Sequence, residues 1–180
     1  MKRIIMHWTA GHHDPSISDL KHYHEIVDGS GVRHEGKFKP EANLNPKSGH
    51  YAAHTRALNT GSIGLAMAAM ALAKESPFSH GPSPITPKQL REFVIMVAEY
   101  CDTYNIKVTP KTVLSHAEVQ PTLGVWQRGK WDITWLPALN KPANPVLVGD
   151  ILRTMVSREL AKLQTPVQKR RTFWQRFFGV

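Results

Sequence analysis

Two histidines and an aspartate supply the strongest chemical signal in this chain. Lys130 lies fourteen residues after His116, and Asp132 follows two residues beyond that lysine. A third candidate ligand, His7, lies far away in sequence, in the apolar run of residues 4–8. Two imidazoles and one carboxylate leave the fourth position of a tetrahedral zinc ion open for water, which is typical of catalytic zinc. These residue types therefore indicate a hydrolytic metal site.

The segments around the candidate ligands predict buried strands. Residues 3–8 form a short apolar run that ends at turn residues, and residues 112–115 are predicted as a short strand that delivers His116 to its end. Residues 62–70 are apolar on both faces, as expected of a central strand, although their alanines leave a helix open. The sequence thus predicts that strand ends hold at least two of the ligands.

Turn and capping signals predict the remaining elements. The turn sequence of residues 28–31 separates two strand-like segments and is typical of a hairpin. Serine, threonine or asparagine residues that can cap a helix, two of them followed by proline, begin three further segments. Helices are therefore predicted near residues 16–23, over residues 86–105 and from residue 144 onward.

Composition limits the class of protein. A chain of 180 residues with 41% hydrophobic residues suits one domain with a substantial core. The single cysteine, Cys101, excludes an internal disulfide and a cysteine-rich zinc site. We expect it to lie on the apolar face of the helix over residues 86–105 and to fill the core. The sequence contains neither an apolar stretch of membrane-spanning length nor a secretory signal, so we expect a cytoplasmic protein.

The net charge of +9 concerns binding partners rather than fold. No nucleic-acid-binding motif accompanies it, so no nucleic-acid partner is expected. Much of the charge lies in residues 166–180, where four cations alternate with four aromatic residues: Lys169, Arg170, Arg171, Arg176, Phe173, Trp174, Phe177 and Phe178. We predict a cationic aromatic tail that contacts anionic membrane or lipopolysaccharide. The alternative is that its aromatic residues pack on the parent domain or on a neighbour.

Five segments, in order, resemble the zinc-dependent N-acetylmuramoyl-L-alanine amidases, a superfamily shared by phage lysins, bacterial cell-wall-recycling amidases and peptidoglycan recognition proteins. The matching segments span about residues 3–137 and are residues 5–10, 23–27, 59–65, 115–119 and 130–132. The resemblance implies an α/β fold with a mixed central sheet of five or six strands flanked by helices. It also implies that His7, His116 and Asp132 bind Zn²⁺. We expect a catalytic domain over residues 1–165.

The resemblance implies further roles at the site. Lys130 would stabilise the oxyanion formed during amide hydrolysis, and Tyr23 matches a tyrosine that phage members place beside the metal. His54 and Trp131 are candidates for contact with substrate. Recycling amidases carry a glutamate as the base where this chain has Ala66. The proton acceptor is therefore left open between Tyr23 and the zinc hydroxide.

The predicted function is hydrolysis of the amide between N-acetylmuramic acid and L-alanine in peptidoglycan. The cationic tail and the lack of an export signal favour a phage or prophage endolysin, which is made in the host cytoplasm and acts on the cell wall after release. Two alternatives stay open, a cytosolic amidase that recycles muropeptides and a non-catalytic module that binds peptidoglycan.

Overall fold

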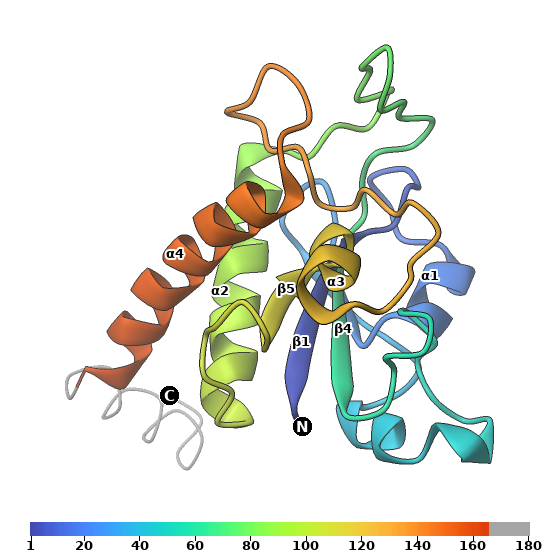
Figure 1. Cartoon of the computed structure of the whole chain (residues 1–180), viewed down its shortest axis with the longest axis vertical. Coiled ribbons are helices and arrows are strands. Elements are labelled where there is room, and N and C mark those ends of the chain that lie inside the picture. Colours follow the sequence, from blue (N-terminus) through green and yellow to red (C-terminus); the bar gives the residue numbers. More distant parts are fainter. Residues whose placement is uncertain (166–180) are drawn as a thin grey trace.

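A mixed five-stranded sheet forms the centre of the protein in the computed structural model, which describes residues 1–165 (Figure 1). The strand order is β3-β2-β4-β1-β5. The strands are β1 (Arg3–Trp8), β2 (Glu25–Val27), β3 (Arg33–Glu35), β4 (Ser62–Met67) and β5 (Val113–Ser115). β1 pairs in parallel with β4 and β5, and β2 pairs in parallel with β4 but antiparallel with β3. The predicted α/β class is confirmed, with five strands.

Within residues 1–165, four α-helices and two short 3-10 helices surround the sheet. They are α1 (Ile17–His22), α2 (Pro87–Thr103), α3 (His116–Leu123), α4 (Pro145–Gln164), η1 (Pro40–Leu44) and η2 (Pro46–Ser48). Ser16, Thr86 and Asn144 cap α1, α2 and α4 with their side chains, as the sequence predicts. The α3 helix was not predicted, because its eight residues include Pro121, which usually argues against a helix.

The alternation of side chains along β1 separates the core from the site. Ile4, Met6 and Trp8 belong to the main hydrophobic cluster, to which α2 and α4 contribute their apolar faces. These two helices lie side by side (Figure 1). Ile5 belongs to a second, smaller cluster with Leu114, and His7 shares its face of the sheet. His7 therefore points away from the main core.

Several predicted boundaries shift in the structure. The central strand ends at Met67 rather than at residue 70, and Met70 has a positive φ of 72°. The hairpin is confirmed as β2–β3, where the carboxylate of Asp28 accepts backbone hydrogen bonds from Ser30 and Val32. Cys101 is buried in α2 as predicted, and burial raises the pKa of its thiol to about 12.

No helix among residues 1–165 has the length and apolar character needed to span a membrane. The predicted tail, residues 166–180, lies outside the described residues, so its predicted role and the predicted domain boundary remain predictions.

Candidate metal centre

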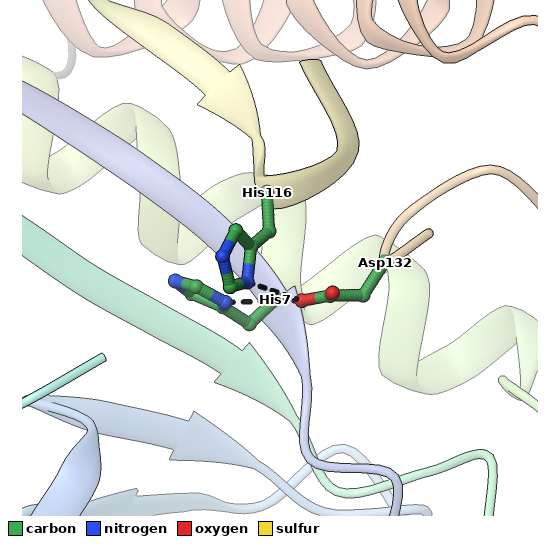
Figure 2. Close-up of side chains that lie close together, drawn as sticks. All are labelled: His7, His116 and Asp132. Atoms are coloured by element: carbon green, nitrogen blue, oxygen red, sulfur yellow. Dashed lines mark hydrogen bonds and ion pairs between the residues drawn. The ribbon is translucent and has the colours of Figure 1, made fainter. Parts of the chain in front are cut away.

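His7, His116 and Asp132 converge although they are remote in the sequence (Figure 2). The Nδ1 atoms of His7 and His116 lie 3.0 and 3.2 Å from the same carboxylate oxygen, Oδ2 of Asp132. One candidate ligand atom from each residue lies within 4.8 Å of the other two. All three side chains are buried. The arrangement brings together two nitrogens and one oxygen at the spacing of a metal site.

Three different elements position these residues. His7 lies on β1, whereas His116 is the first residue of α3, directly after β5. The loop that carries Asp132 is tied to α3 because the backbone N–H of Ala117 donates to the carbonyl of Asp132 at 2.6 Å. The sequence prediction that strand ends deliver the two histidines is confirmed. The position of Asp132 depends on a loop contact.

Gln127 determines which nitrogen of His116 carries the proton. Its Nε2 donates to the backbone carbonyls of Arg56 and Val125, at 3.0 and 3.3 Å. Its Oε1 must therefore face Nε2 of His116, 2.9 Å away, and accept a hydrogen bond from the N–H there. The Nδ1 atom of His116 consequently turns its lone pair toward Asp132.

His54 and Thr55 orient His7 in the same way. Nε2 of His54 lies 3.3 Å from the carbonyl of Ser62 and donates to it, so Nδ1 of His54 is an acceptor. Nε2 of His7 lies 3.3 Å from this nitrogen and 3.4 Å from the Thr55 hydroxyl oxygen, so it carries the proton that faces these two acceptors. The remaining nitrogen of His7 then turns its lone pair toward Asp132. Gly64 makes room for this ring, because an added Cβ would lie 2.3 Å from Cγ of His54.

The result is a convergence of three electron-pair donors on one point. Two imidazole lone pairs and a carboxylate oxygen repel one another unless a proton or a metal ion lies among them. The donor set of two histidines and one carboxylate is one that Zn²⁺ uses in catalytic sites. Hydrogen bonds from the far side of each ring are also typical of histidines that bind zinc. The residues present therefore fit a zinc ion.

The charge states at neutral pH suit a metal as well. Burial lowers the pKa of His7 to about 4, although the nearby Asp132 opposes the shift. Burial alone would raise the pKa of Asp132, but its contacts with His116 and His7 lower it to about 2. A neutral imidazole and an ionised carboxylate are the forms that bind a divalent cation.

The centre opens into a surface cleft of about 660 Å³, which the side chains of Tyr23, His54, Lys130 and Trp131 help to line. The ring of Tyr23 lies 5.1 Å from that of His7, between ring centroids. Trp131 packs edge-on against Trp8 at 4.7 Å, so the wall of the cleft at this point is anchored in the core. Lys130 is exposed. The structure thus places each residue that the sequence selected in or beside one cleft.

The chemistry available to Tyr23 is that of a hydrogen-bond donor. Burial, together with the carboxylates of Asp132 and Asp19, raises the pKa of its hydroxyl, so it keeps its proton at neutral pH.

Ala66 pairs with His7 across β1 and β4 and is fully buried. Among the described residues that line the cleft, Asp132 is the one carboxylate.

The sequence did not indicate the roles of Gln127, which contacts His116, or of Asn43, which supports the loop before His54. Asn43, which is fully buried, bonds through its side chain to both the N–H and the carbonyl of Ala52 and so fixes the loop before His54. Amide and hydroxyl side chains in loops carry no distinctive pattern. The one available signal was the position of Gln127 between two candidate ligands.

Residues 1–134 match the sequence family described as N-acetylmuramoyl-L-alanine amidase. The chain belongs to this family. Membership makes the protein an N-acetylmuramoyl-L-alanine amidase, an enzyme that acts on peptidoglycan. The expected enzyme class is thereby confirmed. No protein among those with curated records matches this amidase in a sequence comparison.

Several solved structures resemble this amidase at low identity. AmiD from E. coli, in complex with the substrate anhydro-N-acetylmuramic acid-L-Ala-D-gamma-Glu-L-Lys, is 22% identical with a TM-score of 0.47, over 65% of this chain and 48% of that chain. The amidase LysC from Clostridium intestinale URNW is 16% identical with a TM-score of 0.43, over 67% and 73% of the two chains. PlyL is 15% identical with a TM-score of 0.46, over 88% and 82%. These scores are low, and family membership follows from the sequence match alone.

Proposed function

We propose that this amidase is a zinc enzyme that cleaves the amide between the lactyl group of N-acetylmuramic acid and L-alanine, with His7, His116 and Asp132 as the zinc ligands. The observation that carries the proposal is the convergence of both Nδ1 atoms on Oδ2 of Asp132, at 3.0 and 3.2 Å. Nε2 of each ring already has a hydrogen-bond partner in the protein, His54 for His7 and Gln127 for His116, which leaves the two Nδ1 atoms for a cation.

The residues of the cleft have different roles in amide hydrolysis. When bound, zinc would lower the pKa of a water molecule toward about 7 and polarise the carbonyl of the substrate. Lys130 supplies positive charge beside the site, where negative charge develops on the carbonyl oxygen. Tyr23, which keeps its proton, donates a hydrogen bond to the same oxygen. His54 and Trp131 form the wall, and we assign His54 to the support of His7 because its ring nitrogens already have protein partners.

Digestion of purified sacculi tests the reaction. The wild-type protein should contain about one zinc per chain and release peptide stems that begin with L-alanine, detected by mass spectrometry. His116→Ala should release none, because it removes one of three ligands. His22→Ala changes an exposed histidine and should behave as the wild type. Equal release of stems by the His116→Ala protein would contradict the proposed site.

We further propose that the enzyme acts as a phage or prophage endolysin and that residues 166–180 assist it at an anionic outer membrane. The support is the composition of the tail, in which cations alternate with aromatic residues. Deletion of residues 167–180 should lower lysis of intact cells but leave lysis of permeabilised cells unchanged. Equal lysis of intact cells by the truncated protein would remove the tail from the proposal.

The choice of substrate distinguishes an endolysin from a recycling amidase. An endolysin should cleave intact sacculi faster than soluble anhydro-muropeptides, and a recycling enzyme should show the reverse order. The AmiD ligand shows the chemistry of such a stem: its glutamate is linked through the γ-carboxyl, which leaves the α-carboxylate free. We expect the substrate of this amidase to carry a comparable free carboxylate on the residue after L-alanine.

A further inference from the structure

Two arginines that line the cleft share one exposed tryptophan, Trp126. The guanidinium carbons of Arg56 and Arg128 lie 5.1 and 5.6 Å from the centre of the Trp126 ring system. Both distances are within the range of a cation–π contact. The indole is 58% exposed, which is unusual for so large an apolar side chain. We call these three residues the arginine–tryptophan cluster.

The cluster is built onto the metal centre through Gln127. This amide bonds to His116 on one side and to the backbone carbonyl of Arg56 on the other. Trp126 and Arg128 are its immediate neighbours in the chain. A single buried side chain therefore ties the two loops that carry the cluster both to each other and to a candidate ligand. This connection fixes the backbone of both loops relative to the metal centre, and both arginine side chains are exposed.

The arginines have no acidic partner among residues 1–165. The ion pairs within this range involve other residues, and neither Arg56 nor Arg128 takes part in one. Both line the cleft, as does Lys130, and the only carboxylate lining it in this part of the chain is that of Asp132. Three cations thus face a cleft whose one carboxylate among residues 1–165 belongs to the candidate metal centre. The charge of the cleft favours an anionic substrate.

We infer that the arginine–tryptophan cluster binds a free carboxylate of the peptide stem, on the residue that follows L-alanine. This inference rests on the proposed function. A guanidinium presents several N–H donors in a plane, which matches the two oxygens of a carboxylate. The indole holds the guanidinium groups in place from the side, so fewer side-chain rotations are lost when the ligand binds. Binding at this point would orient the scissile amide in the cleft.

A pair of synthetic substrates tests the inference. Both are muramoyl peptides that carry γ-linked glutamate after L-alanine; one has the free α-carboxylate and the other has a carboxamide there. The wild-type enzyme should show a KM about tenfold lower for the carboxylate substrate than for the carboxamide substrate, because the carboxamide lacks one charge-assisted contact. Its kcat should be similar for both substrates, because the carboxylate does not react.

Arg56→Gln and Arg128→Gln should each raise KM about tenfold for the carboxylate substrate and leave KM for the carboxamide nearly unchanged. Trp126→Leu should weaken the same preference, because it removes the ring that orients both guanidinium groups. Arg158→Gln, an exposed arginine on α4 that does not line this cleft, should keep the wild-type preference.

The inference is overturned if the wild-type enzyme does not discriminate between the two substrates, or if the arginine variants retain the discrimination. A loss of affinity for both substrates alike would assign the cluster to the sugar or to the shared peptide backbone and would equally overturn it. Failure of the proposed function has a separate signature, because neither substrate would then yield a peptide that begins with L-alanine.

Discussion

Each imidazole of the metal centre is held by two contacts, one on either side of the ring. His116 faces Asp132 with Nδ1 and bonds Gln127 with Nε2, and His7 divides its nitrogens between Asp132 and His54 in the same way. The outer contact selects the tautomer, so the inner nitrogen keeps its lone pair for a cation. Removal of an outer partner should therefore weaken zinc binding although no ligand is lost.

Gln127→Leu tests this expectation. The leucine has a similar volume but cannot accept from His116 or donate to the carbonyl of Arg56. We expect zinc affinity to fall about 10- to 100-fold, measured by competition with a chelator of known affinity. Gln164→Leu makes the same change at the exposed end of α4 and should leave zinc affinity unchanged. Unaltered affinity in the Gln127→Leu protein would show that the amide does not orient His116.

At the scale of elements, α4 supports the helix that carries His116. Glu118 of α3 is fully buried and accepts a hydrogen bond from the backbone of Ser115 at 2.8 Å. Nη2 of Arg153, on α4, lies 2.8 Å from Oε1 of Glu118, which is ion-pair distance, although the two groups are poorly aligned for a hydrogen bond. Nη1 of Arg153 donates a hydrogen bond to the carbonyl of Val113. Because α4 lies beyond the matched residues 1–134, this support comes from outside the family match.

Gly149→Ala should disturb the contact between the two helices. A Cβ at this position would lie 1.9 Å from a carboxylate oxygen of Glu118. We expect a loss of about 1–3 kcal/mol in the free energy of unfolding, measured by denaturant titration, because buried overpacking forces neighbours to move. An alanine in an unobstructed helix position would instead add up to about 1 kcal/mol. The sign of the change therefore decides whether α4 packs tightly on Glu118, and Ser157→Ala on the exposed face of α4 should be nearly neutral.

At the scale of the whole molecule, three of the buried histidines, His7, His24 and His54, make folding sensitive to acid. Burial lowers the pKa of His7 and of His24 to about 4, and it lowers the pKa of His54 well below the usual value. Between about pH 6.5 and pH 4 these histidines are protonated in the unfolded chain but not in the folded protein. The unfolded state then binds more protons, so stability rises with pH in this window and falls on acidification. The lowered pKa of Asp132 acts in the same direction near pH 2 to 4.

The metal-free protein should therefore lose stability between pH 7 and pH 5. His7 and His24 should each contribute about 2 kcal/mol to that loss in the free energy of unfolding. Denaturant titrations in the presence of a chelator measure it. A flat profile from pH 7 to pH 5 would mean that the buried histidines are charged or accessible in the folded protein.

Local patterns in the sequence were sufficient to predict most elements of the fold. Alternation and apolar runs indicated β1, β4 and β5, the turn over residues 28–31 indicated the β2–β3 hairpin, and capping residues marked α1, α2 and α4. Each of these signals acts within a few residues, so it can be read from the chain itself. The short helix α3 was missed because its internal proline opposes the local signal, and packing against α4 and β5 overrides it.

The amino-acid sequence by itself determined the residue types at the centre and, through the order of the matching segments, the family. Only the tertiary structure decided which nitrogen of each histidine faces Asp132, and it did so through Gln127 and His54. The same holds for the arginines that share Trp126 and for the space that Gly149 leaves for Glu118. These arrangements depend on contacts between residues far apart in the chain, and side-chain orientation at such contacts is set by packing rather than by local preference.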